Sequence, residues 1–262
     1  MIIVVCGMQR SASTWSYNVC REVAHRAGLE IDPSSGQYGS EDMVEKVSEG
    51  VPRNTALLLR NHWLDPAMLD LIKRREVRAV YTVRDPRDVV ASILYTFGNN
   101  FKNAVRDLER SLSIMEALKA GDSALVLRFP DIMSSPERMV SEIADYLGMP
   151  VSEDDARSIT DALSREKLRQ KSTSLSPEKQ KVYNGFSYDS ETLLLDNHIR
   201  LDRPADWQEH LSESQGRFLS WHWQDSLDWL GTPPREEEMG SWIAWPERLY
   251  YLARLRLWQQ RD

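Results

Sequence analysis

IIVVCGMQRSASTW, residues 2–15, is the most informative stretch of this 262-residue chain. Its continuous apolar run over residues 2–6 predicts a buried strand, and a glycine turn leads from there into a helical pattern from about Ser13 to Arg26. A strand that feeds a helix through such a turn presents unpaired backbone N–H groups and the positive end of the helix dipole, which together favour an anion. The stretch therefore predicts an α/β fold with an anion site at its first turn.

The rest of the chain continues to alternate strand and helix patterns. Strand patterns cover residues 55–59, 77–83 and 124–128, and helix patterns cover residues 66–74, 86–97, 101–119, 136–147, 153–163 and 212–230. This alternation predicts a mostly parallel central sheet flanked by helices. We expect one domain over residues 1–262, with a helical C-terminal extension at about residues 231–262.

Two segments do not show the alternating strand and helix pattern. Residues 30–53 are polar and turn-rich. Residues 165–190 are expected to be loop-like, and within them Arg165 to Lys181 holds a local surplus of basic side chains. The basic segment is interpreted either as a solvated surface loop or as a lid over an anionic ligand. The amphipathic stretch 241–259 is expected to pack on the domain, with a homodimer contact as the alternative.

Composition excludes several classes of partner. A formal net charge of -7 and a pI near 5.4 argue against nucleic acid or an anionic membrane surface as the main partner. Cys6 and Cys20 do not suggest a disulfide framework, and no spaced His/Cys cluster suggests a metal site. The opening MIIVVCGM is too short for a signal peptide or a membrane span, so a cytoplasmic location is expected.

The polar turn carries hydroxyl groups at Ser11, Ser13 and Thr14 and a charge at Arg10, and no acidic residue precedes Glu22. A Walker A loop would need a second glycine followed by lysine, and neither is present, which disfavours an ordinary Mg-ATP site. A plain strand-to-helix turn with capping serines is the structural alternative.

GMQRSASTW, residues 7–15, resembles the loop of PAPS-dependent sulfotransferases, commonly written P-K-S-G-T-T-W, with residues 9–15 in register. Gln9, Arg10 and Ala12 depart from that pattern, although arginine keeps the positive charge of the lysine. The resemblance implies the P-loop-like sulfotransferase fold. It also implies that the donor PAPS is bound here, with its 5′-phosphate held by Arg10, Ser11, Ala12, Ser13, Thr14 and Trp15.

A second stretch, YTVRDPRDVVAS at residues 81–92, resembles the family pattern V-R-N-P-x-D-x-x-x-S. Asp85 and Asp88 would occupy the N-terminus of the following helix and complement its dipole, so the side chains of Arg84 and Ser92 must bind any anion. The resemblance implies that this pair holds the 3′-phosphate of PAPS. HIRLDRPADWQEHL, residues 198–211, resembles the family's R-K-G-x-x-G-D-W-K region and adds Arg200 as a 3′-phosphate ligand.

Arg60-Asn61-His62 follows the second predicted strand and resembles the family's K-T-H. The resemblance implies that His62 is the general base, that Arg60 replaces the donor-contacting lysine, and that Arg10 lies nearest the bridging oxygen. The expected reaction moves a sulfuryl group from PAPS to a hydroxyl, or as second choice an amine, of a small-molecule or glycan acceptor and leaves PAP. The alternatives are a P-loop-type small-molecule kinase, with Asp85 as a Mg²⁺ ligand, and a noncatalytic protein that binds PAP or another nucleotide.

Overall fold

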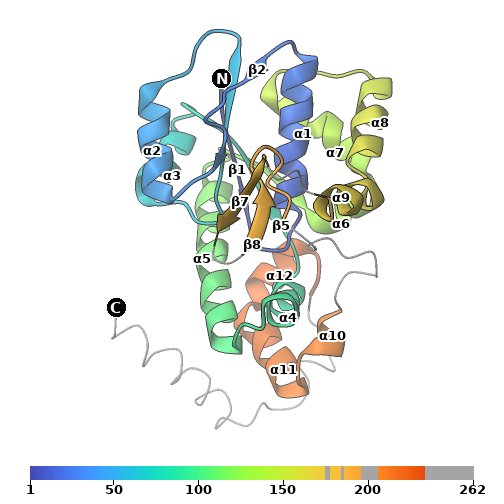
Figure 1. Ribbon diagram of the computed structural model, residues 1–262. Coiled ribbons are helices and arrows are strands. Elements are labelled where there is room, and N and C mark those ends of the chain that lie inside the picture. Colours follow the sequence, from blue (N-terminus) through green and yellow to red (C-terminus); the bar gives the residue numbers. More distant parts are fainter. Residues whose placement is uncertain (175–177, 184–185, 196–205, 234–262) are drawn as a thin grey trace. The chain divides into compact units, whose positions relative to one another are not determined.

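The computed structural model describes residues 1–174, 178–183, 186–195 and 206–233 (Figure 1). These residues form two compact units. Unit 1 comprises residues 1–7, 11–82 and the described residues from 114 to 195, and unit 2 comprises residues 8–10, 83–113 and 206–233. The single-domain organisation stays a prediction, and the expected C-terminal extension lies outside the described residues from position 234 onward.

The elements alternate much as the sequence predicts. The strands are β1 (Ile2–Gly7), β2 (Glu30–Ile31), β3 (Gly36–Gln37), β4 (Thr55–Arg60), β5 (Arg78–Val83), β6 (Leu125–Arg128), β7 (Gln180–Tyr183) and β8 (Phe186–Asp189). The helices are α1 (Ser13–Arg26), α2 (Ser40–Glu49), α3 (Pro66–Lys73), α4 (Pro86–Phe97), α5 (Phe101–Ala120), α6 (Phe129–Ser134), α7 (Pro136–Leu147), α8 (Glu153–Ala162), α9 (Arg165–Ser172), α10 (Trp207–His210), α11 (Glu213–His222) and α12 (Gln224–Leu230).

The central sheet has the strand order β2-β4-β1-β5-β6, and β3 also pairs with β4. β1 runs parallel to both of its neighbours, with Val5 aligned to Arg60 of β4 and to Val80 of β5. The carboxyl ends of these three strands therefore meet at one edge of the sheet, where open α/β sheets place their ligands. The predicted mostly parallel sheet is confirmed.

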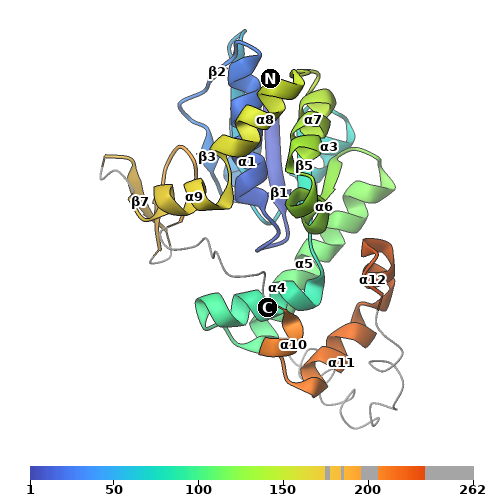
Figure 2. The ribbon, with the colours of Figure 1, turned by 90° about the vertical axis from the view of Figure 1, so that its right-hand side faces the viewer.

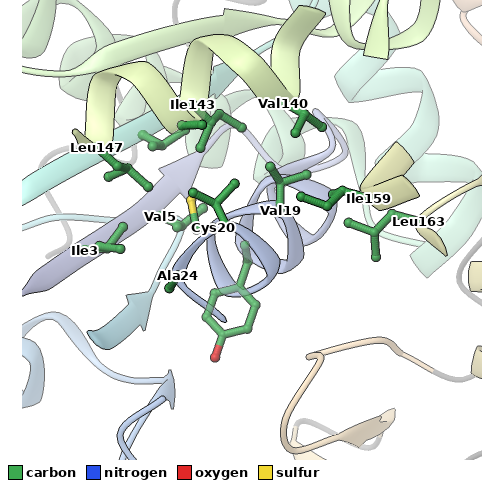
Figure 3. Packing of buried hydrophobic residues seen from close by; sticks show 14 of the residues in the cluster. Ile3, Val5, Val19, Cys20, Ala24, Val140, Ile143, Leu147, Ile159 and Leu163 are labelled. Atoms are coloured by element: carbon green, nitrogen blue, oxygen red, sulfur yellow. The ribbon is translucent and has the colours of Figure 1, made fainter. Parts of the chain in front are cut away.

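Both faces of β1 are buried, because side chains alternate along a strand and all of them from position 3 to 6 are inaccessible to solvent. Figure 1 shows α2 and α3 on one side of the strands and α1, α7 and α8 on the other. Figure 3 shows the apolar side chains of α1 and α7 meeting over Ile3 and Val5 of β1. This packing fixes the start of α1 relative to the end of β1.

Three predictions about secondary structure are corrected. Residues 30–53 are not turns throughout, because they contain α2, a ten-residue helix of mostly polar side chains in which Met43 is the one buried residue. Residues 165–190 are not a plain loop, since α9 leads toward the hairpin of β7 and β8 (Figure 2). The helix expected over residues 212–230 is interrupted at Trp223, which separates α11 from α12.

Candidate functional site

The predicted site residues fall into two groups, one in each unit, and the first group begins at the turn between β1 and α1. Gly7 lies so close to β5 that a Cβ atom would collide with Thr82, whose carbonyl oxygen would be 2.7 Å away. Ala12, the N-cap of α1, has a left-handed backbone with φ 73°. A left-handed residue before a helix turns successive N–H groups toward a common point, which is an arrangement that binds anions.

The N-terminus of α1 has no side-chain cap hydrogen bond and no acidic residue in its first turn. Its backbone donors and its dipole are thus not complemented from within the helix. The hydroxyl of Ser11 is fully buried and bonds to Thr82, with Oγ 2.7 Å from Oγ1 and 3.1 Å from the carbonyl oxygen. Ser11 therefore anchors the turn to β5, whereas the sequence predicted its hydroxyl as a ligand donor.

The other residues of the turn take different positions. The Ser13 hydroxyl accepts a hydrogen bond from Arg60, with the Nη2 atom 3.0 Å away. The Thr14 carbonyl accepts a bond from Asn18, and Trp15 packs against the buried apolar cluster of unit 1. Packing of Trp15 orients the first turn of α1.

Arg60, at the end of β4, is a buried cation with 8% of its surface exposed. Its Nη1 atom donates to Gln37 Oε1 at 2.7 Å, and its Nη2 atom donates to Ser13 and to the Nε2 atom of His62 at 3.1 Å. All of these partners are neutral acceptors, and within the described residues no carboxylate pairs with Arg60. Burial lowers the pKa of Arg60 to about 10, so the group stays charged at neutral pH.

His62 is held between a donor and an acceptor. Its Nδ1 atom is 2.9 Å from the carbonyl oxygen of Gly7, which can only accept, so Nδ1 carries the proton. Its Nε2 atom faces the guanidinium of Arg60, which can only donate, so Nε2 carries the lone pair. The backbone N–H groups of His62 and Trp63 both bond to Asn61 Oδ1, which fixes the bend after β4.

The second group of predicted residues lies in unit 2, around the start of α4. Arg84 is 5% exposed and pairs with Asp88 through Nη2, 3.3 Å from Oδ2. Ser92, also buried, accepts a hydrogen bond from the Nε atom of Arg10 at 2.9 Å. The guanidinium of Arg10 also lies 5.9 Å from the ring centroid of Phe97. The structure thus joins Arg10 to the second sequence stretch, although the sequence placed it with the first.

Asp85 caps α4 as predicted, since its side chain accepts from the backbone N–H of Arg87. Both of its carboxylate oxygens also accept from the guanidinium of Arg87, at 3.1 and 2.7 Å. Arg87 in turn donates to Ser220 and to the Thr232 carbonyl. A carboxylate used in this way is a structural clamp, which counts against Asp85 as a Mg²⁺ ligand.

The sequence did not identify some residues that shape these groups. Gln37 belongs to a two-residue strand, and Thr82 gives no signal beyond its place at a strand end. The hydroxyl of Tyr17 is buried with no hydrogen-bond partner in the described structure, and burial raises its pKa to about 12 against the opposing charges of Arg21 and Arg60. An apolar helix face gives no hint of such a group.

Arg200 lies outside the described residues. In the part of the chain that the structure covers, no three His, Cys, Asp or Glu side chains gather as metal ligands. None of the helices in that part has the length and apolar character that crossing a bilayer requires.

A family model described as "Sulfotransferase domain" matches residues 2–231. No curated protein sequence matches the chain. Retinol dehydratase has a similar structure in its complex with androsterone and inactive cofactor PAP, with TM-score 0.60, 18% identity and coverage of 86% of this chain and 80% of that chain. Its complex with retinol and PAP gives TM-score 0.58, 18% identity and coverage of 86% and 81%.

A mouse sulfotransferase complexed with PAP gives TM-score 0.62, 16% identity and coverage of 86% of this chain and 83% of that chain. At such low identities these likenesses bear on the fold, and they confirm the fold class predicted from the sequence.

Proposed function

Because the chain belongs to the sulfotransferase domain family, we propose that it transfers a sulfuryl group from PAPS to a hydroxyl group of a small-molecule acceptor. The similar structures contain PAP, the product that PAPS leaves, and two of them contain retinol or androsterone. Those hydroxyl-bearing compounds support an acceptor of that class. An amine or glycan acceptor, a homodimer and a cytoplasmic location stay predictions from the sequence.

The observation that carries this proposal is the buried charge of Arg60. Burying a cation without a carboxylate is costly, because the low-dielectric interior does not replace the hydration that the charge loses. A bound anion supplies the missing countercharge. Arg60 occupies the position where the family resemblance expects the donor-contacting cation, so an anionic donor accounts for both its burial and its neutral partners.

We assign the 5′-phosphate of PAPS to the start of α1 in unit 1. The uncapped N-terminus, the left-handed Ala12 and the first-turn residues Ser13 and Thr14 support this assignment. Ser11 contributes by tying the turn to Thr82.

We assign the 3′-phosphate to Arg84 and Ser92 in unit 2. The bond from Arg10 to Ser92 supports adding Arg10 to that set, in place of its expected position at the bridging oxygen. Arg200 stays a ligand implied by the family resemblance.

His62 is the proposed general base. Its Nε2 lone pair takes the proton of the acceptor hydroxyl as the acceptor oxygen bonds to sulfur, while Nδ1 keeps its proton and donates it in a hydrogen bond to the Gly7 carbonyl oxygen. The bond between sulfur and the bridging oxygen breaks, and its electron pair goes to PAP, where Arg60 stabilises the charge. The bond between Arg60 and Nε2 must open before this step, and an anion that binds Arg60 would open it.

The same contacts bear on the kinase and on the noncatalytic PAP-binding protein, the two alternatives from the sequence. A small-molecule kinase needs a Mg²⁺ ligand, and the clamp between Asp85 and Arg87 disfavours the residue that would serve. A noncatalytic protein that binds PAP would need the same phosphate-binding residues but no base. His62, with a defined tautomer beside Arg60, favours the enzyme.

One experiment tests donor, reaction and base together. PAP should raise the melting temperature of the wild type more than ATP with Mg²⁺ does, and labelled PAPS should sulfate a member of a panel of hydroxyl and amine compounds. His62→Ala should lose transfer by on the order of 10³-fold while it keeps near-normal PAP binding, because the base does not hold the nucleotide. A larger shift with ATP would favour the kinase, and an active His62→Ala would mean that another group is the base.

A further inference from the structure

Gln37 has no role in any of the sequence patterns, yet it makes the shortest hydrogen bond to Arg60. The two residues are aligned in the parallel pairing of β3 with β4. The backbone N–H of the next residue, Tyr38, donates to the Arg60 carbonyl at 3.2 Å, which continues the pairing past the end of β3. Backbone hydrogen bonds on both sides thus fix the position from which the Gln37 side chain reaches the guanidinium.

The bonds to Arg60 are divided between the two terminal nitrogens. The Nη1 atom donates to Gln37, whereas the Nη2 atom donates to both Ser13 and His62. The Nε atom is buried and has no hydrogen-bond partner in the described residues. An anion that displaces the bonds on Nη2 would therefore also meet the unused donor at Nε, while Nη1 remains anchored to Gln37.

A glutamate at position 37 would have nearly the same volume and could accept the same hydrogen bond. It would also pair its charge with that of Arg60, as Asp88 does with Arg84 in unit 2. A glutamine holds the guanidinium in place and leaves the full positive charge for another partner.

We infer that Gln37 is a positioning residue for sulfuryl transfer, whose neutral amide oxygen orients Arg60 and leaves its charge uncompensated for the phosphosulfate group of the donor. This inference rests on the proposed function, because it takes Arg60 as the cation that contacts PAPS.

The variants Gln37→Glu and Gln37→Ala separate orientation from charge. Gln37→Glu keeps an acceptor but cancels the charge, so its Kd for PAP should rise by on the order of 10-fold and its kcat should fall by on the order of 100-fold. Its melting temperature should equal or exceed that of the wild type. Gln37→Ala keeps the charge but loses the anchor, so kcat should fall by about 10-fold with PAP affinity near that of the wild type.

Calorimetry with PAP, thermal melting, and turnover of labelled PAPS with the acceptor found in the panel give these values. Gln224→Glu, at an exposed position of α12, makes the same change in net charge and should match the wild type in all three measurements. If Gln37→Glu does not fold, Gln37→Met replaces it: a lower kcat at unchanged KM for PAPS supports the inference, and an unchanged kcat overturns it.

The inference depends on which of the two variants, Gln37→Glu or Gln37→Ala, binds PAP more weakly and turns over more slowly. A purely structural acceptor is replaced better by glutamate than by alanine, so a Gln37→Glu protein that binds PAP and turns over at least as well as Gln37→Ala overturns it. A wild type that neither binds PAP nor transfers sulfate overturns the proposed function and this inference together. If the wild type binds PAP and transfers sulfate but Gln37→Glu performs at least as well as Gln37→Ala, only the inference is overturned.

Discussion

Helices α1 of unit 1 and α4 of unit 2 both follow a strand of the parallel sheet, yet they begin in opposite ways. α1 starts at the left-handed Ala12, without a side-chain cap and without an acidic residue in its first turn. α4 starts at Asp85, whose side chain caps it, and carries Asp88 in its first turn. The positive end of one helix is left for an external anion, while that of the other is already complemented by the protein's own carboxylates.

The buried arginine of each unit repeats this difference. Arg60 has neutral partners in the described structure, whereas Arg84 is paired with Asp88. Burial raises the pKa of Asp88 in spite of the opposing effect of Arg84. An anion bound to Arg84 would compete with the Asp88 carboxylate for the positive charge. An anion bound to Arg60 would interact with a positive charge that no carboxylate of the described structure neutralises. We infer that the reacting group binds where the charge is uncompensated.

Arg60→Met and Arg84→Met should therefore have opposite effects on stability. Arg60→Met removes a buried cation that lacks a carboxylate, so the free energy of unfolding should stay the same or rise, while turnover of PAPS falls by on the order of 10³-fold. Arg84→Met leaves Asp88 without its cation, so the free energy of unfolding should fall by about 2 kcal/mol and PAP should bind more weakly. Urea denaturation and calorimetry with PAP measure both effects.

Arg138→Met is the matched control, because Arg138 is 60% exposed and its ion pairs lie at the surface. Its free energy of unfolding should change by less than about 0.5 kcal/mol. If Arg60→Met destabilises the protein as much as Arg84→Met does, Arg60 has a countercharge in the folded chain and the contrast between the units is wrong.

Local signals explain which parts of the fold could be predicted from the sequence. The apolar run of β1 and the Asp85-Pro86 pair at the start of α4 are readable because each acts on its immediate neighbours, and both boundaries are confirmed. α2 is harder to predict because it is short and mostly polar, with Met43, Val44 and Val47 as its apolar residues.

The contacts of the site were harder to predict than the residues that make them. Family resemblance drew attention to Arg10 and Arg60, but their partners depend on tertiary structure. Arg10 bonds to Ser92, 82 positions away, and Arg60 bonds to Gln37 in a strand too short to leave a pattern. Only the pairing of β3 with β4 brings Gln37 to the guanidinium.

Asp88→Asn should leave Arg84, like Arg60, without a paired carboxylate. The asparagine keeps an oxygen for the backbone N–H of Trp207, which donates to Asp88 Oδ1 at 3.1 Å, but it removes the countercharge. With one negative charge fewer beside Arg84, PAP should bind more tightly by on the order of 10-fold at pH 7. Weaker binding would contradict this, because it would mean that the carboxylate serves phosphate binding by orienting Arg84.

The pH dependence of stability gives a second measure of the same variant. Because the pKa of Asp88 is raised by burial, the folded state binds a proton more readily than the unfolded state. The wild type should therefore lose stability relative to Asp88→Asn as pH rises from 3.8, the ordinary pKa of an aspartate, through the raised pKa of the folded state.

Ala12→Gly is expected to have the smallest effect, and it tests the unusual start of α1. Ala12 has φ 73° and ψ 24°, a left-handed conformation in which a Cβ atom is strained and glycine is not. The substitution should raise the free energy of unfolding by about 1 kcal/mol, measured by urea denaturation. Ala117→Gly inside α5 should instead lower it by about 1 kcal/mol, because glycine weakens an ordinary helical position. Equal losses in both variants would mean that the turn is not strained, whereas opposite signs would show that unit 1 holds this turn, our proposed anion site, in place at the expense of stability.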